Sequence, residues 1–223
     1  MIMEQTVDMS FMPGKTQQVL KRLAAGKFIS DFILVGGSAL AIQIKHRLSE
    51  DLDLLFDGEE LPMARIKRNI LRIFPGHRIT RQDHSWQIDF LIDQVRITFF
   101  SSGAVAIPSD LKKYSFRKNG LNIASAKLIA ALKFSAISQR NTIRDYYDLY
   151  MLARDHYPLL ELISYTRKIF PNLSPITYTG TLVYTKDIEE EDIASHLSPA
   201  EIITKDQMAD YFTQELIKIK EQI

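Results

Sequence analysis

Phe32–Phe56 reads FILVGGSALAIQIKHRLSEDLDLLF, and this stretch decides the fold. Its apolar start, Phe32–Val35, predicts a buried strand, and the Gly-Gly-Ser turn that follows predicts a helix over residues 38–45. A second strand is expected over Leu52–Phe56, where apolar residues return. The stretch therefore predicts a strand, a tight turn, a helix and a second strand in close succession.

Two acidic residues at the start of the second strand carry the most chemistry. Asp51 and Asp53 stand two apart, so their side chains point to the same face of the sheet. Two carboxylates on a rigid strand suit Mg²⁺ or Mn²⁺, with phosphate oxygens completing the ligand shell. Gly36 and Gly37 allow close backbone approach, and Ser38 opens a helix whose N-terminus favours an anion. The stretch predicts a phosphate site facing a metal site.

The spacing of Gly37-Ser38 and Asp51-x-Asp53 resembles the nucleotidyltransferase superfamily that includes DNA polymerase β. The longer string, GGSAL at residues 36–40 followed by HRLSEDLDL at residues 46–54, is similar to the AbiEii/AbiGii toxin family of type IV toxin–antitoxin and abortive-infection systems. The resemblance implies a Mg²⁺-dependent enzyme that transfers a nucleoside monophosphate from an NTP to an acceptor. It suggests RNA, such as a tRNA, as acceptor, and an antitoxin encoded nearby as partner.

The resemblance also implies roles for single residues. Asp51 and Asp53 are expected to be the metal ligands and catalytic carboxylates, and the Gly36–Ser38 turn is expected to bind the triphosphate. Arg47 has two interpretations, which the sequence leaves open. Together with His46 it either contacts phosphate or base, or lies on a solvated loop.

A second block of the same family resemblance lies further along the chain, with AKL at residues 126–128 and RDYYDLY at residues 144–150. Lys127 is expected to act as a cation for the triphosphate, with Arg140 helping to neutralise it. Asp145 and Asp148 lie three apart on one helix face, and one of them is expected to orient one of these two cations. The aspartate that matches Asp145 belongs to the family's active-site motifs. In this interpretation Lys127 and Asp145 are catalytic and Arg140 binds nucleotide.

One departure from the family pattern bears on activity. The family strand that reads roughly Gly-Val-Lys-Val-Asp-Phe corresponds here to Gln94–Phe99, with Thr98 in place of the aspartate. Threonine is neither a good Mg²⁺ ligand nor a base near neutral pH. Asp89, on the preceding strand, is expected to face away from the core rather than to replace the missing group. An alternative function is therefore a catalytically impaired module that binds a nucleotide or a partner.

The fold class expected is α+β. Strands are predicted over residues 77–81, 86–92 and 95–100, and composition changes after Gly103. We therefore expect a nucleotidyltransferase-like α/β domain over residues 1–103, with a mixed sheet flanked by helices. A mostly helical domain is expected over residues 104–223, with a loop over residues 171–184. In this domain Asp148 is expected to form a surface pair with Arg144, four residues earlier.

Composition limits the remaining possibilities. The chain has 223 residues, a net charge of +1 and no cysteine, which fits a reducing cytoplasm and excludes thiolate metal sites. Its N-terminus has no sustained apolar run, so neither a signal peptide nor a membrane partner is expected. Lys112–Arg140 holds seven basic residues and no acidic one. A further alternative is thus an RNA-binding accessory protein that uses this basic stretch.

Overall fold

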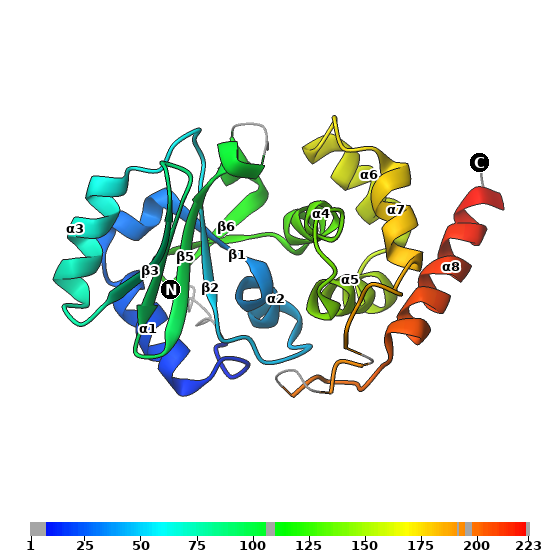
Figure 1. The fold of residues 1–223 in the computed structure, drawn as a ribbon, viewed down its shortest axis with the longest axis horizontal. Helices are drawn as coiled ribbons and strands as arrows, with labels where there is room; N and C mark the ends of the chain where they lie inside the picture. Colours follow the sequence, from blue (N-terminus) through cyan, green and yellow to red (C-terminus); the bar gives the residue numbers. More distant parts are fainter. Residues whose placement is uncertain (1–7, 106–109, 191, 195–197, 222–223) are drawn as a thin grey trace, which may run out of the picture. The chain divides into compact units, whose positions relative to one another are not determined.

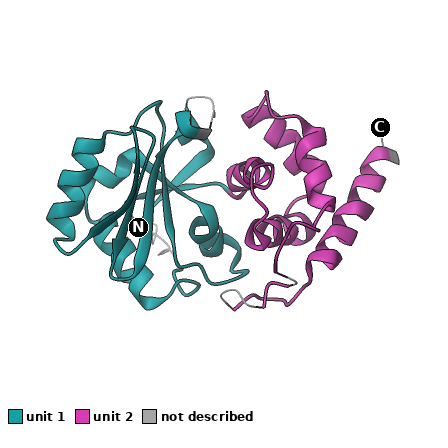
Figure 2. Cartoon of the chain, viewed as in Figure 1, with its two compact units in different colours: residues 1–125 teal, residues 126–223 magenta. Residues whose placement is uncertain are grey.

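The computed structural model describes residues 8–105, 110–190, 192–194 and 198–221. The chain divides into two compact units, an N-terminal unit of residues Met1–Ser125 and a C-terminal unit of residues Ala126–Ile223 (Figure 2). The boundary lies later than the Gly103/Ala104 boundary expected from composition. The reason is that two more strands of the sheet follow Gly103 before the helices begin.

A seven-stranded mixed sheet, in the order β3-β4-β5-β2-β1-β7-β6, forms the centre of the N-terminal unit (Figure 1). β2 runs parallel to β5 and β1 runs parallel to β7, whereas the other neighbours are antiparallel. The α+β class expected from the sequence is confirmed. The strands are β1 (Phe32–Val35), β2 (Leu52–Phe56), β3 (Arg78–Asp83), β4 (Gln87–Ile92), β5 (Val95–Ser101), β6 (Ser115–Lys118) and β7 (Leu121–Ala124).

Helices cover both faces of this sheet. Figure 1 shows α1 (Gly14–Ala24) and α3 (Met63–Ile73) on one face and α2 (Gly36–Ile44) on the other. α1 buries Val19, Leu20 and Leu23, which recur at the three- and four-residue spacing of one helix face. Short 3₁₀ turns complete the unit: η1 (Lys27–Asp31), η2 (Ser102–Val105) and η3 (Leu111–Tyr114).

The two faces of the central strands differ in chemistry. Aromatic side chains pack together on the face toward α1 and α3, with the rings of Phe32 and Phe99 centred 5.0 Å apart and those of Phe90 and Phe99 6.0 Å apart. Because side chains alternate along a strand, Thr98 and Asp89 belong to the opposite face. The alternation of side chains along β4 and β5 thus places aromatic residues on one face of the sheet and polar residues on the other.

The C-terminal unit is a group of five helices in the described part of the chain: α4 (Ala126–Ile137), α5 (Ile143–Asp155), α6 (Leu159–Ile169), α7 (Pro175–Val183) and α8 (Lys205–Glu221). α4 packs against α5, α6 and α7, and the rings of Phe134 and Tyr178 are centred 5.0 Å apart in its core. α7 lies where the sequence predicted a loop. No helix of the described residues is long and apolar enough to cross a membrane.

Candidate active site

The turn between β1 and α2 lies directly against one of the two predicted metal ligands. Gly36 is the first residue of α2 and has a φ of +69°, which L side chains rarely adopt. A Cβ atom at this position would overlap Oδ2 of Asp53. The strand register explains this proximity, because Val35, the last residue of β1, is the partner of Asp53 on β2. The structure therefore brings the glycine turn and the carboxylate together.

Ser38 links the same turn to the other carboxylate-bearing residue. Its side chain is buried, donates a hydrogen bond to the main-chain carbonyl of Asp51 and is hydrogen-bonded to Ser49 Oγ at 3.0 Å. This hydrogen bond is partly buried, and its net contribution to stability is about 0.5–1.5 kcal/mol. Ser38 therefore fixes the first turn of α2 against the beginning of β2.

The carboxylate of Asp51 is partly exposed and faces an arginine that the sequence analysis missed. Arg96 Nη2 lies 2.5 Å from Asp51 Oδ2. Burial lowers the pKa of Arg96, but the negative charge of Asp51, followed by those of Asp53 and Asp89, raises the pKa above its usual value. The carboxylates of Asp51, Asp53 and Asp89 thus stabilise the positive charge of Arg96. Alternation along β5, which sets Arg96 and Thr98 on one face, was the sequence signal for this residue.

Arg47 lies beside the glycine turn rather than on a solvated loop. Only 3% of Arg47 and 1% of His46 is exposed, which excludes the solvated interpretation. Nη1 of Arg47 donates to the carbonyl of Leu48 at 3.0 Å, and a Cβ atom on Gly37 would lie 2.6 Å from Nη2. A glycine at position 37 therefore leaves the space that the guanidinium group needs.

A transverse row of residues crosses three strands on the polar face of the sheet. Asp53 on β2 is the partner of Thr98 on β5, and Thr98 is the partner of Asp89 on β4. Asp89 is 8% exposed and accepts a hydrogen bond from Gln87 Nε2 at 2.9 Å. Asp89 does face away from the aromatic core, as expected. It lies on the same face of the sheet as Asp53.

The metal-ligand candidates in this unit are Asp51 and Asp53. Among the described residues no group of three or more His, Cys, Asp or Glu side chains is arranged to hold a metal ion. Carboxylate oxygens are nevertheless the donors that Mg²⁺ prefers, and it commonly takes only one or two of them from the protein. The donor chemistry therefore fits Mg²⁺ with the remaining ligands supplied by substrate and water.

In the C-terminal unit Asp145 lies at the centre of a buried ionic network. Its carboxylate accepts hydrogen bonds from Lys133 Nζ at 2.5 Å and from Arg140 Nε at 2.9 Å. Burial raises the pKa of Asp145, but the charges of Lys133 and Arg140 outweigh this effect, and the pKa lies below its usual value. The expectation that Asp145 orients one of the two cations agrees with its contact to Arg140.

The surface pair expected for Asp148 is wrong. Asp148 is fully buried, and its Oδ2 atom lies 2.7 Å from Lys133 Nζ. Lys133, on α4, thus bridges two carboxylates of α5. A buried charge needs partners of opposite sign, and Lys133 has two of them, Asp145 and Asp148.

Lys127 lies apart from this network. Its ammonium group pairs with Glu161, which raises the pKa of Lys127, and lies 5.0 Å from the ring centre of Tyr157. Lys127 is in the first turn of α4 and Arg140 follows its last turn, so the two are about 20 Å apart along the helix axis. Asp145 pairs with Lys133 and Arg140, whereas Lys127 pairs with Glu161, so Asp145 does not orient Lys127.

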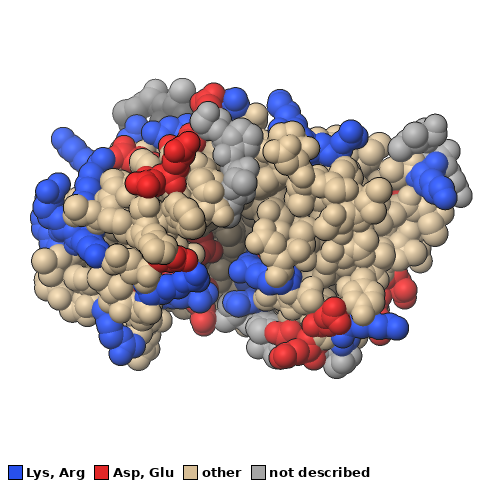
Figure 3. All heavy atoms as spheres, turned by 45° about the horizontal axis from the view of Figure 1, so that its top comes forward, with Lys and Arg blue, Asp and Glu red and all other residues tan. Residues whose placement is uncertain are grey.

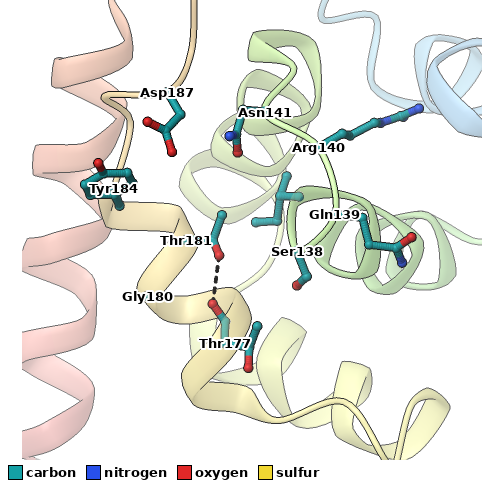
Figure 4. A pocket seen from close by; sticks show the side chains of 10 residues that line it. Ser138, Gln139, Arg140, Asn141, Thr177, Gly180, Thr181, Tyr184 and Asp187 are labelled. Atoms are coloured by element: carbon teal, nitrogen blue, oxygen red, sulfur yellow. Dashed lines mark hydrogen bonds between the residues drawn. The ribbon is translucent and has the colours of Figure 1, made fainter.

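A hollow of about 410 Å³ in the C-terminal unit is lined mostly by neutral hydroxyl and amide groups (Figure 4). Thr177 and Thr181 of α7 face it, and Thr181 Oγ1 donates to the Thr177 carbonyl at 2.8 Å. Figure 4 shows the side chain of Arg140 leading away from the hollow, while Asp187 lies near Asn141. Because Arg140 does not point into it, the hollow offers little to an anionic phosphate.

Several basic residues of the stretch Lys112–Arg140 are paired with acidic side chains. Lys133 is buried between carboxylates, Lys113 pairs with Asp110 at 3.2 Å, and Lys127 pairs with Glu161. Figure 3 shows basic and acidic side chains interspersed on the visible face, with basic atoms gathered at the edge where α3 lies. The structure therefore gives no support to an RNA-binding role of this stretch.

Residues 18–199 match the family model described as "Nucleotidyl transferase AbiEii toxin, Type IV TA system". The chain belongs to this family. A relative named "Uncharacterized protein aq_aa25", from Aquifex aeolicus (strain VF5), is 29% identical over 200 residues, which cover 87% of this chain and 95% of the relative. The crystal structure of JHP933 from Helicobacter pylori matches with a TM-score of 0.53, 15% identity and 93% coverage of each chain. At that identity the likeness concerns the fold alone.

The family resemblance drawn from the two motif blocks is thereby confirmed. The AbiEii match includes both the Gly36–Asp53 segment and the helical block around Asp145. The chain is therefore a member of a family of nucleotidyltransferase toxins. The match includes the turn of Gly36–Ser38 together with Asp51 and Asp53, whose roles stay predictions.

Proposed function

We propose that this AbiEii-family protein transfers a nucleoside monophosphate from an NTP to an acceptor, and that the acceptor is RNA, such as a tRNA. One observation carries the proposal: the glycine turn at the start of α2 lies against the carboxylate of Asp53, and Ser38 in the same turn bonds the carbonyl of Asp51. A helix N-terminus favours an anion, and adjacent carboxylates favour a cation. This pairing suits a metal–triphosphate complex.

The proposed roles follow from this geometry. Asp51 and Asp53 would hold Mg²⁺ or Mn²⁺, which when bound neutralises the triphosphate and polarises the phosphorus that is attacked. Main-chain N–H groups of Gly36 and Gly37, in the first turn of α2, would donate to phosphate oxygens. Arg47, whose guanidinium group lies next to Gly37, adds positive charge to the same turn.

Three predicted site residues belong to the C-terminal unit, and their roles stay predictions: catalysis for Lys127 and Asp145, and nucleotide binding for Arg140. Asp145 accepts a hydrogen bond from Nε of Arg140 and so fixes the orientation of the guanidinium group, which could then bind a phosphate group. Lys127 would have to exchange its partner Glu161 for a substrate phosphate. Of these residues, Arg140 and Asp145 are therefore the better supported.

We also propose that the protein acts in the cytoplasm as the toxin of a two-component system, restrained by an antitoxin encoded nearby. Support comes from the family, which is described as the toxin of a type IV toxin–antitoxin system. Co-expression with the product of the neighbouring gene tests the idea: growth arrest by this chain alone, relieved by the neighbour, is the expected result.

The transfer reaction is tested with purified protein, labelled NTPs, Mg²⁺ and total RNA. We expect label to appear in RNA with the wild type and to be lost by about a hundredfold or more in Asp51→Asn and Asp53→Asn. Asp83→Asn is the matched control, because Asp83 is an acid at the end of β3 that pairs with Arg81 outside the carboxylate row. Transfer that persisted in both site variants would refute the assignment.

A second function, nucleotide binding without transfer, is favoured by one specific observation. Thr98 is the partner of Asp53 on the neighbouring strand, where the family pattern has a carboxylate. Loss of a general base typically costs about 10²–10⁴ in rate. Calorimetry would decide between the functions: nucleotide binding in the absence of any transfer, with every metal and acceptor tried, would favour the binding module.

A further inference from the structure

We propose that Asp89 is the catalytic base of this protein and takes the role of the carboxylate that is missing at position 98. This inference rests on the proposed transfer function and adds a residue to it. The base has moved by one strand, from β5 to β4, while remaining in the same transverse row of the sheet.

The register of the sheet is the first support. Residues directly opposite each other on neighbouring strands present their side chains on the same face. Asp53 is opposite Thr98, and Thr98 is opposite Asp89, so the three side chains lie in one line across β2, β5 and β4. A carboxylate two strands away from Asp53 thus faces the same space as Asp53.

The surroundings of Asp89 are the second support. A hydrogen bond from Gln87 Nε2 to Asp89 Oδ1 fixes the carboxylate, and Thr80 Oγ1 donates to the main-chain carbonyl at 3.4 Å. Arg81 of β3 is opposite Asp89, but the ion pair of Arg81 is with Asp83, at 3.3 Å. The charge of Asp89 also acts on Arg96, the partner of Asp51. Asp89 is therefore fixed in position and lies close enough to Arg96 to interact with it electrostatically.

Distance decides which role Asp89 can fill. Neighbouring strands are about 4.8 Å apart, so Asp53 and Asp89 are about 10 Å apart across the sheet. Side chains that stand upright at this spacing do not meet at one Mg²⁺, whose oxygen ligands lie only about 2.1 Å from it. A base, in contrast, needs to reach only the proton of the acceptor, at about 2.6–3.2 Å between heavy atoms. The space above Thr98, between the two acids, is where an acceptor hydroxyl would lie.

The proposed step balances as follows. The acceptor hydroxyl oxygen attacks the α-phosphorus of the NTP, forming a new P–O bond, and its proton passes to the carboxylate of Asp89. The bond between the α-phosphorus and the bridging oxygen breaks, and pyrophosphate leaves with the electron pair. Thr98, whose hydroxyl group can both accept and donate a hydrogen bond, would orient the acceptor hydroxyl group.

The test compares isosteric variants within one hairpin. Asp89→Asn keeps an acceptor for the Gln87 amide but cannot take a proton. Asp93→Asn is the matched control, because Asp93 lies in the turn of the same hairpin, is exposed and has a φ of +51° that asparagine tolerates. Asp89→Glu keeps the carboxylate and shifts it by one methylene group. Thr98→Asp combined with Asp89→Asn restores a carboxylate at the position of the family pattern.

We expect Asp89→Asn to transfer at least a hundredfold more slowly than the wild type and Asp93→Asn to match it. Asp89→Glu should fall between them, and Thr98→Asp should recover at least tenfold in the Asp89→Asn background. Affinity for Mg²⁺ with a non-hydrolysable NTP, measured by calorimetry, should change less than twofold in Asp89→Asn. Unchanged affinity also shows that this variant is folded.

Several outcomes would overturn the inference. If Asp89→Asn transferred at the wild-type rate while Asp51→Asn and Asp53→Asn were inactive, Asp89 would not be the base and the proposed function would stand. If Asp89→Asn lost nucleotide affinity as much as rate, its role would be structural. Absence of transfer by the wild type would defeat both the inference and the proposed function. If Asp89→Asn did not fold, a wild-type rate in Asp89→Ser would count against the inference, because a serine hydroxyl group is not a base near neutral pH.

Discussion

Gly36 and Asp53 are so close that a methyl group on residue 36 would overlap a carboxylate oxygen of Asp53. The backbone at Gly36 also has a φ of +69°, in the left-handed region. Both observations have one origin, because β1 ends opposite Asp53 and the chain must turn at once into α2. Residue 36 must therefore be a glycine for Asp53, a metal-ligand candidate, to occupy its position.

We expect Gly36→Ala to lower the free energy of unfolding by about 1–3 kcal/mol, because alanine is strained at positive φ. Transfer activity should also fall, since the new methyl group displaces Asp53. Gly14→Ala is the control, as a Cβ atom there meets nothing within 4 Å and alanine favours the helix. Urea unfolding of both variants checks the prediction. Equal stability of the two variants would contradict it.

We expect Lys133→Met to lower the free energy of unfolding by about 3–5 kcal/mol. The substitution leaves Asp145 and Asp148 buried, without the ammonium group between them. Lys127→Met, on the same helix, is the control and should cost at most about 1 kcal/mol, because its ion pair with Glu161 is partly exposed. The measurement is chemical denaturation at neutral pH. A loss no larger than that of the control would show that the network contributes little.

Stability should depend on the protonation of Asp145 in acid. Its pKa is lowered in the folded protein, so the unfolded chain takes up the proton first as pH falls. The contribution of Asp145 is therefore complete well above pH 4, near the ordinary aspartate pKa, and is lost as pH falls through the folded-state pKa. Urea unfolding at a series of pH values from about 6 to about 2.5 should show a shallower acid dependence in Asp145→Asn. Parallel profiles of wild type and variant would rule this out.

Arg96→Gln should tighten the binding of Mn²⁺ in the absence of nucleotide. Arg96 pairs with Asp51 and competes with a metal cation for the same carboxylate. Because the pair is partly exposed and its energy is about 0.2–1 kcal/mol, affinity should rise by a factor of about 1.4 to 5. Calorimetric titration of the metal checks this, with Arg81→Gln as a control on the polar face that pairs outside the site. Weaker metal binding in Arg96→Gln would argue against Asp51 as a ligand.

Much of the N-terminal unit could be predicted from sequence because its signals are local. The Gly-Gly-Ser turn between two apolar runs and the Asp-x-Asp pair decided β1, α2 and β2, and the structure places these residues together. β6 and β7 were missed. β1 is as short as β6 and β7 but consists of four apolar residues, whereas β6 and β7 contain polar residues and β7 pairs with β1, far away in sequence. Such a short strand is recognisable by its partner rather than by its own composition.

Tertiary packing also overrode local preference in the C-terminal unit. Pro175–Val183 is rich in threonine and contains a glycine, which disfavours a helix, yet it forms α7. Two residues four apart, Tyr178 and Leu182, are fully buried there, and this burial decides the helix. The charge pairs of Lys133 and Lys127 were equally beyond the sequence, because each depends on how helices pack.

Asp53, Thr98 and Asp89 lie in one line across three strands, and this arrangement bears on how family members that lack an aligned active-site carboxylate should be compared. A sequence alignment compares residues at equivalent positions only. A carboxylate that has moved to a neighbouring strand is therefore counted as lost. Residues that face each other on paired strands, however, occupy neighbouring positions in space even when eight residues of a hairpin separate them in the sequence. A protein that alignment would discard as inactive can therefore retain its full set of acids, distributed differently over the same surface.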